Sequence, residues 1–366
     1  MGKSIPNQNQ QAGVALITVL VISAILIVYA TFILNDRQIS DRRTFNILNA
    51  SRAQQYMAGA ETFGISLLEQ FLQQSKAKRL VRTQQWATTP MQFPIEDNQG
   101  TLEGSVRDMH SCFNLNSIVL EQQTPASGAG QTGSGQAGGT DTELTDPNAS
   151  SNATSSIGTS AGFGSQLAGE KIFIKIIEPL LPSETEATPT ALAASLRDWV
   201  DEDQEVAGAD GAEDYTYTGY EIPYRTGDTL LAHSSELLVI KGFTPAIYDA
   251  IKDYICVLPT KEGSINVNTV KPEQAELVWA LLDGVDLATV RQVLEDMPDD
   301  GYEQGDFFTA LGSGKLSKEG AGRLVFDSQY LLLTATANIK TGRAQTKSLL
   351  LKNNDQFQVV SRHIGD

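Results

Sequence analysis

One acidic segment holds the side chains whose type and spacing point most clearly to chemistry. It reads LRDWVDEDQEVAGADGAEDYTYTGYEIPYRTGD, and from Asp198 to Asp228 it has ten carboxylates against one base, Arg225. Carboxylates held in one compact loop repel one another, and a hard divalent cation with oxygen ligands relieves that repulsion. The interleaved glycines and aromatic residues distinguish the segment from a floppy acidic tail. We therefore weigh a metal site against a solvated acidic surface loop.

The segment does not match an EF-hand, and no catalytic set accompanies it. Val206 and Ala212 stand where the EF-hand loop needs a glycine and its closing glutamate. The chain's three histidines are scattered, without an HExxH pattern or a companion nucleophile. Paired carboxylates alone could suggest hydrolysis, but nothing else in the sequence supports an enzyme.

Cys112 and Cys256 are the two cysteines of the chain. If the body lies in an oxidising compartment, one disulfide is expected, and the alternative is two buried thiols. The bond would close a loop of about 145 residues, which is worth roughly 4–5 kcal/mol on the chain-entropy model. We predict the disulfide.

Two stretches resemble helix-hairpin-helix or sterile-alpha-motif-like units, with a glycine in the tight turn. They are ELLVIKGFTPAIYDAI (Glu236 to Ile251) and INVNTVKPEQAELVWAL (Ile265 to Leu281). Such hairpins often bind the DNA backbone, but the net charge of −17 would repel phosphates. We expect them to pack within the protein, with no nucleic-acid partner.

An apolar helix must anchor these elements to a membrane. Val14 to Leu34 contains no charged residue, and its 21 residues are enough to cross roughly 30 Å of hydrocarbon. An uncleaved signal anchor and a prepilin cut between Gly13 and Val14 both fit this segment, whereas a secretory signal peptide fits poorly. Beyond it, apolar residues recur at three- and four-residue steps: Ala53, Tyr56, Met57, Ala60, Gly64, Leu67, Leu68 and Phe71. The pattern predicts one helix from about Val14 to about Arg79.

The composition and the spacing of apolar residues change several times along the remaining chain. Gly100 to Leu120 alternates like strands, Thr124 to Gly162 is too polar and glycine-rich to order itself, Lys171 to about Ser317 is mainly helical, and strands return to the C-terminus. We expect an α+β fold in which a pilin-like long N-terminal helix packs on an antiparallel sheet with a large inserted helical domain. The expected divisions are a leader at 1–13, a membrane helix at 14–34, an amphipathic helix with first strands at 35–122, a disordered insertion at 123–168, a helical domain at 169–322 and closing strands at 323–366.

Taken together, four features resemble the minor pseudopilin K family of the type II secretion system. They are the Gly13–Val14 junction with its apolar helix, CFNLN at Cys112 to Asn116, the acidic sequence from Asp198 to Tyr217, and SELLVIKGF followed by INVNT. The resemblance covers nearly the whole chain except Thr124 to Gly162. The combination is specific, although each motif alone is weak.

The resemblance implies that the N-terminus is cleaved and modified in a particular way. A prepilin peptidase would cut after Gly13, and Val14 would become the methylated first residue. Most pseudopilins carry a glutamate at the fifth mature position, where this chain has Thr18. That glutamate can neutralise the amine of the subunit above, which otherwise is an unpaired charge in hydrocarbon. A neutral residue is therefore expected in a subunit with nothing above it.

The resemblance also implies partners and a cofactor. It implies a tip complex with the I and J minor pseudopilins, contact with H, with the major pseudopilin G and with the inner-membrane assembly platform, and a role in starting pseudopilus assembly for protein export. The body would lie in the periplasm. A relative's helical domain binds calcium, which carries Ca²⁺ onto Asp201, Asp203, Glu213 and Asp214 as expected ligands. The competing interpretations are a DNA-handling pilin-like protein of a competence system and a signal-anchored periplasmic enzyme.

Overall fold

The computed structural model describes residues 8–74, 79–95, 100–121, 166–312 and 314–365. For residues 8–15 it describes the backbone alone. The leader therefore falls inside the described part only from residue 8, and the insertion expected at 123–168 only from residue 166.

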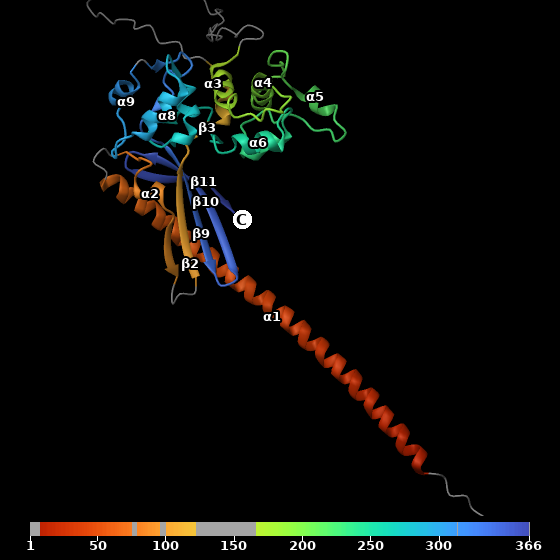
Figure 1. Ribbon diagram of the computed structural model, residues 1–366. Helices are drawn as coiled ribbons and strands as arrows, with labels where there is room; N and C mark the ends of the chain where they lie inside the picture. Colours follow the sequence, from red (N-terminus) through yellow and green to blue (C-terminus); the bar gives the residue numbers. More distant parts are fainter. Residues whose placement is uncertain (1–7, 75–78, 96–99, 122–165, 313, 366) are drawn as a thin grey trace, which may run out of the picture.

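One helix dominates the N-terminal fifth of the chain. α1 runs from Gln8 to Gln74 without interruption, and its first half projects far beyond the body (Figure 1). Among the described residues it is the one helix long and apolar enough to cross a membrane. Its large apolar side chains from Leu16 to Leu34 are exposed, as expected of a segment whose solvent is lipid. The predicted long helix is confirmed, and it begins six residues before Val14.

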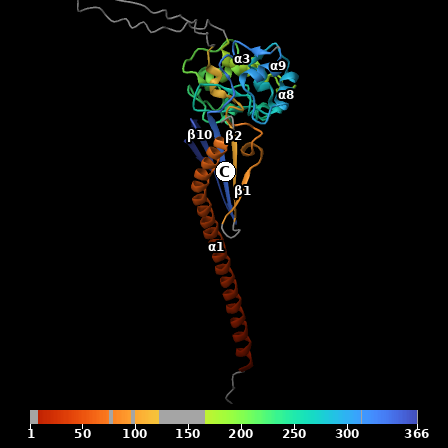
Figure 2. The same cartoon turned by 90° about the vertical axis from the view of Figure 1, so that its left-hand side faces the viewer.

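The second half of α1 packs on a five-stranded antiparallel sheet, as Figure 2 shows from the side. Ala53, Met57 and Ala60 pack against alanines of β9 and β10, and further along Leu68 and Leu72 pack against leucines of the same strands. The alanines let the helix approach the sheet closely, and the leucines fill the space where they meet. The apolar face predicted from the sequence spacing is the face that is buried.

The sheet has the order β1-β2-β9-β10-β11. Its strands are β1 (Met91–Ile95), β2 (Gly100–Asp108), β9 (Tyr330–Ile339), β10 (Gly342–Asn353) and β11 (Gln356–Ile364), and a short helix α2 (Gln85–Thr88) precedes β1. β2 pairs directly with β9, although more than 200 residues separate them in the chain. The sheet is therefore split by an insertion, as expected for the α+β fold, and the strands predicted at the C-terminus are confirmed.

The inserted head domain stands on the end of the sheet that lies away from the projecting half of α1 (Figures 1 and 2). Its elements share one large apolar core. They are β3 (Phe113–Asn114), η2 (Leu115–Val119), α3 (Ala168–Ile177), α4 (Pro189–Val200), α5 (Asp214–Thr218), η3 (Ser234–Val239), α6 (Pro245–Ile251), β4 (Ile255–Cys256), β5 (Ile265–Asn266), η4 (Pro272–Gln274), α7 (Glu276–Trp279), β6 (Leu282–Asp283), α8 (Leu287–Glu295), α9 (Gln304–Leu311), β7 (Lys315–Leu316) and β8 (Leu324–Val325).

The head begins earlier than the sequence suggested. We expected residues up to 122 to belong with the first strands of the sheet, but Phe113, Leu115 and Ile118 are buried in the core of the head. Likewise β8 pairs with β5 inside the head, so the closing strands of the sheet start at Tyr330 rather than at 323. The alternating residues of CFNLN predict a strand, but the segment forms only the two-residue strand β3 and the start of the 3-10 helix η2. A local sequence pattern cannot tell which sheet a two-residue strand joins.

The head contains two units with the same opening. In the first, β3 and the motif Asn114-x-Asn116 start the unit, and β4 pairs parallel with β3; in the second, β5 and Asn266-x-Asn268 start it, and β8 pairs parallel with β5. The Asn116 amide donates to two carbonyls and accepts the Leu231 N–H. Likewise, the Asn268 amide donates to the carbonyls of Tyr302 and Phe326 and accepts the Tyr302 N–H. Each buried amide thus satisfies loop backbone groups that have no ladder partner.

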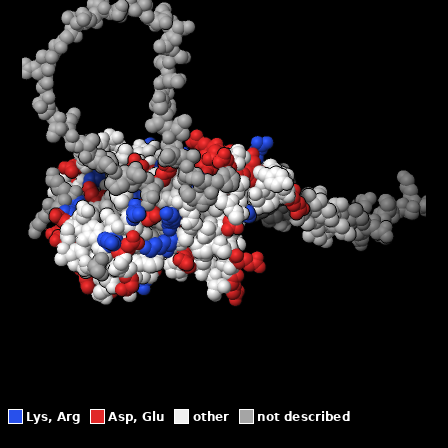
Figure 3. All heavy atoms as spheres, turned by 90° about the horizontal axis from the view of Figure 1, so that it is seen from above, with Lys and Arg blue, Asp and Glu red and all other residues white. Residues whose placement is uncertain are grey.

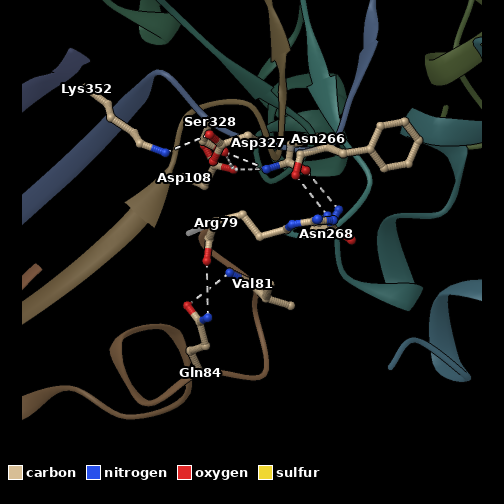
Figure 4. Close-up of polar contacts among 10 residues, drawn as sticks. Arg79, Val81, Gln84, Asp108, Asn266, Asn268, Asp327, Ser328 and Lys352 are labelled. Carbon is tan, nitrogen blue, oxygen red and sulfur yellow. Dashed lines mark hydrogen bonds and ion pairs between the residues drawn. The ribbon is translucent and has the colours of Figure 1, made fainter. Parts of the chain in front are cut away.

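Two chain crossings join the sheet to the head, and Asp108 lies between them (Figure 4). Its Oδ2 accepts hydrogen bonds from the side chains of Asn266, Ser328 and Thr269, and its Oδ1 accepts the His110 N–H at 2.9 Å. Asp108 is buried, so these donors replace the water that a carboxylate would otherwise need. At this junction, which we call the neck, the protein itself satisfies the Asp108 carboxylate, although the buried His110 Nδ1 beside it has no hydrogen-bond partner among the described residues.

Candidate metal site

The last turn of α4 places two carboxylates at one end of the acidic segment. Thr188 caps α4 by accepting the Ala191 N–H, and the helix ends at Asp201. Asp198 is fully buried, and its two oxygens accept the backbone N–H groups of Ala207 at 2.9 Å and Ala212 at 2.6 Å. These bonds fold the loop back over the helix end. The C-terminal end of a helix carries partial negative charge, so an anion there is disfavoured and a cation is favoured.

Glu213 completes a compact group with these two aspartates. One oxygen from each of Asp198, Asp201 and Glu213 lies within 4.8 Å of the others. Glu213 is buried just before α5, and no hydrogen-bond donor reaches either of its carboxylate oxygens. Asp201 has one oxygen facing Arg197 at 3.4 Å and a second, buried oxygen that receives no hydrogen bond. Three acids therefore converge with several unsatisfied oxygens among them.

The electrostatic cost of this arrangement appears in the pKa of each carboxyl group. Burial raises the pKa of Asp198 to about 6, against the effect of its two backbone hydrogen bonds. Burial and the neighbouring charges of Asp203 and Asp198 raise the pKa of Asp201 to about 7. Burial and four nearby aspartates raise the pKa of Glu213 to about 8. Without a counter-ion, the group would hold protons at pH values where isolated carboxyl groups have lost them.

A divalent cation fits these residues. Buried carboxylate oxygens without donors are expensive, and oxygen ligands at a helix C-terminus are what Ca²⁺ accepts. Asp228 supports the same interpretation, because its backbone adopts the left-handed region (φ 46°) and its buried Oδ1 has no hydrogen-bond donor. The charge of Asp228 also raises the pKa of Glu213. Asp198, Asp201 and Glu213 would hold the ion, and the ion would neutralise their mutual repulsion.

The expected ligands divide into two groups. Asp201 and Glu213 lie together, as the acidic loop suggested. Asp203 is exposed and its Oδ1 accepts the Glu205 N–H at 2.8 Å, although its charge acts on both. Asp214 turns away: it accepts the Thr226 N–H and hydroxyl and faces Arg225, and these hydrogen bonds lower its pKa. Sequence reasoning counted Asp198 among the ten carboxylates but missed its position in the group.

The two cysteines are joined. Cys112 and Cys256 form a disulfide with a Cα–Cα distance of 5.7 Å, which confirms the predicted bond. It connects the first crossing from the sheet with β4 of the head. The cross-link therefore lies beside the Asp108 junction rather than beside the acidic group.

The processing residues stand apart from the head. Gly13 and Val14 belong to α1, but their side chains lie outside the described residues. Thr18 is on the exposed apolar part of α1. Processing and the fifth mature position remain predictions from the sequence.

A long apolar helix on a split antiparallel sheet, with a helical head on the far end, defines a membrane-anchored pilin-like subunit. Two family models match the chain at residues 111–260 and 265–326, and both describe type II secretion system (T2SS) protein K. The chain belongs to this family and is a minor pseudopilin of the type II secretion system.

Individual relatives and a solved structure agree with the family assignment. The chain is 29% identical to type II secretion system protein K of Aeromonas hydrophila over 98% of each chain, and 28% identical to that of Klebsiella pneumoniae over 98% of this chain and 97% of the other. The fold is similar to a chain in the crystal structure of the GspK-GspI-GspJ complex from enterotoxigenic Escherichia coli. The TM-score is 0.65 at 24% identity, covering 88% of this chain and 99% of that one.

Proposed function

We propose that this chain is the tip subunit of the pseudopilus, which binds the I and J minor pseudopilins and starts pseudopilus assembly for export across the outer membrane. The observation that carries the proposal is the position of the head. It stands on the end of the sheet opposite the membrane helix, where a subunit stacked above would have to sit (Figure 1). A bulky head at that place is compatible with the top of a filament and hinders the middle of one.

Thr18 supports the same position. A subunit with another above it benefits from a negative charge here, because the charge neutralises a buried amine. Thr18 carries no charge, so this position offers no carboxylate that could neutralise the amine of such a neighbour. Thr18→Glu should leave assembly of the tip complex unchanged, since the new carboxylate has no required partner. Loss of the complex in this variant would contradict the tip position.

The partners can be tested by co-purification. A tagged full-length chain, extracted from membranes that also hold the I and J proteins, should retain both through size-exclusion chromatography. The matched control is the major pseudopilin G carrying the same tag, which should not enrich I and J to the same extent. Recovery of the chain alone would overturn the tip-complex proposal.

We further propose that the chain is cut between Gly13 and Val14, methylated at Val14 and anchored in the inner membrane with its body in the periplasm. The uncharged segment of α1 from Val14 to Leu34 and the disulfide support this placement. Mass spectrometry of the membrane form should find a chain that starts at methylated Val14. An intact Met1 would contradict the proposed processing.

The acidic group is proposed to bind Ca²⁺ as a structural ion, and the chain is proposed to act without catalysis. The support is the convergence of Asp198, Asp201 and Glu213 with buried oxygens that lack donors. In this role the ion neutralises charge and ties the acidic loop to α4. Calorimetric titration of the full-length chain with Ca²⁺ tests the site directly, and absence of binding at millimolar Ca²⁺ would remove it.

A further inference from the structure

Exposed apolar side chains concentrate on one part of the head. Among the described residues outside α1, eight large apolar side chains are exposed, and six of them lie in one stretch of about 34 residues. We call these six the 206–239 patch: Val206, Tyr215, Tyr220, Ile222, Leu238 and Val239. Tyr215 is 92% exposed and Ile222 is 81% exposed, so both project into solvent. Scattered apolar residues are ordinary on a surface, but a local concentration of this kind marks an interaction site.

The segments that carry the 206–239 patch are tied together. The Tyr224 hydroxyl donates to the Val239 carbonyl at 2.7 Å, and the Tyr224 ring lies 5.7 Å from the ring of Tyr220. The Lys241 N–H donates to the Tyr217 hydroxyl, and Lys241 Nζ donates to the carbonyls of Asp210 and Gly211. The acidic loop and η3 therefore form one surface rather than two independent loops.

The patch also has a stiff base. Behind it, the rings of Trp199 and Tyr217 are buried and meet edge to face at 5.3 Å. Asp214 accepts both the N–H and the hydroxyl of Thr226, which closes the turn that presents Tyr215 and Ile222. Apolar side chains held in place before binding lose little conformational entropy on binding, and tyrosine is among the residues enriched at binding hot spots.

The charges around the patch select the partner. The exposed carboxylates between residues 201 and 241 are Glu202, Asp203, Glu205, Asp210 and Glu221. The exposed bases of this segment are Arg225 and Lys241, and Lys261 from outside it pairs with Glu202 at 3.5 Å, so acids outnumber bases around the patch. Figure 3 shows that the membrane-distal face of the molecule has separate areas where acidic and basic side chains gather. A partner for an apolar surface with an acidic rim must itself be apolar and basic.

The same charges exclude two other occupants. A second copy of this chain would bring one acidic rim against another, which costs energy. The apolar part of α1, which would lie in lipid, projects from the end of the molecule opposite the head (Figure 2), and the acidic rim would repel anionic headgroups. We propose that the 206–239 patch is a docking surface for a protein partner that presents apolar side chains flanked by lysine or arginine. The proposal does not depend on the tip position or on the I and J proteins.

Site-specific photo-crosslinking tests this surface in the full-length chain in its own membrane. Benzoylphenylalanine replaces Ile222 or Leu238 in the patch, and Ile364, which is 73% exposed on β11, serves as the matched control. We expect both patch positions to give an adduct with the same protein, about tenfold above the yield at position 364. The crosslinked peptide of the partner should contain an apolar residue next to lysine or arginine. Adducts with a second copy of the chain, with lipid alone, or equally at position 364 would overturn the proposal.

Charge reversal separates docking from folding. Glu221→Lys should reduce the adduct from position 238 about tenfold, because it repels the basic partner. Glu295→Lys, on the exposed end of α8, is the matched control and should leave the adduct unchanged. Both variants change exposed residues, and equal melting temperatures verify that the head remains folded. Equal adduct yields from the two variants would contradict the proposed basic partner.

Discussion

Asp108 and the acidic group at the end of α4 are two ways of burying carboxylates in one protein. At the neck, one carboxylate is surrounded by neutral donors from Asn266, Ser328 and Thr269 and by the His110 N–H. At the end of α4, three carboxylates face one another and both oxygens of Glu213 lack a donor. The difference teaches that burial alone says little about function. What matters is whether the protein itself satisfies the charge, as it does at the neck, or leaves that to an ion.

Substitution of Asp108 is the strongest test of the difference between the two buried carboxylate sites. Asp108→Ala should lower the free energy of unfolding by about 3–5 kcal/mol, because it leaves buried donors unpaired at the junction of the sheet and the head. Calcium should not restore the loss. Urea unfolding of the full-length chain in detergent, with and without Ca²⁺, measures both statements. Asp249→Ala, which removes the exposed partner of the exposed Lys252, is the control and should cost less than about 1 kcal/mol. A calcium-dependent loss at Asp108 would erase the distinction between the two sites.

Chelation should affect only the acidic group. Removing Ca²⁺ from a chain held at about 100 times its dissociation constant should lower the free energy of unfolding by about 2.7 kcal/mol. Glu213→Gln should make the chain less stable than the wild type in Ca²⁺ and more stable in chelator, since it removes both a ligand and a repelling charge. Melting curves of both chains in both buffers give the four values needed. The same order of stability in both buffers would contradict the ion site.

Two aspartates distinguish the structure from the sequence expectation. Asp198→Asn should weaken Ca²⁺ binding by about tenfold or more, since the buried group loses charge. Asp214→Asn should leave Ca²⁺ affinity nearly unchanged, because that side chain accepts hydrogen bonds from Thr226 and faces Arg225. Calorimetric titration of the two variants decides the matter. A larger loss for the second variant would restore the ligand set inferred from sequence.

The acidic group should also make the stability of the chain depend on pH. The pKa values of Asp198, Asp201 and Glu213 are raised to about 6, 7 and 8, whereas in an unfolded chain they are near 4. Their contribution to stability is therefore most favourable below the unfolded pKa and is lost as the pH rises through the folded values. In chelator, the melting temperature should fall between about pH 5 and pH 8, and excess Ca²⁺ should flatten the curve. Asp108→Ala should keep the same pH slope, since the neck is not part of the group.

Periodicity carried the fold prediction a long way. The buried face of α1 and the three C-terminal strands follow from three-to-four and two-residue spacing, since one face of each element meets the core. The segment Phe113–Val119 did not follow, because two-residue strands and 3-10 turns carry no period. Their place depends on parallel pairing with β4, which is more than 140 residues away in the sequence.

The candidate site was predictable in composition but not in membership. A run of carboxylates in the sequence predicts electrostatic repulsion. Which carboxylates lie close together depends on where α4 ends and on how the acidic loop after it folds back. Asp198 lies in the group because the Ala207 and Ala212 N–H groups donate to its carboxylate. Asp214 lies outside the group because its carboxylate accepts hydrogen bonds from Thr226. The Asn-x-Asn motifs at Asn114 and Asn266 can be read in the sequence, but their hydrogen bonds to distant loops cannot be predicted from it. Long-range contacts, rather than residue type, decided both cases.

The position of the disulfide has a mechanical consequence. Only two stretches of backbone, after β2 and before β9, join the sheet to the head, and Cys112 lies directly on the first. A force along α1 would reach the sheet through packed side chains and the Glu61–Arg362 ion pair. From there it would reach the head through the two backbone stretches and through residues 79–83, where the Arg82 N–H donates to the Asn268 carbonyl and Arg79 pairs with Glu303. The disulfide between Cys112 and Cys256 ties the first stretch covalently to β4, so the link between sheet and head does not depend on hydrogen bonds and packing alone.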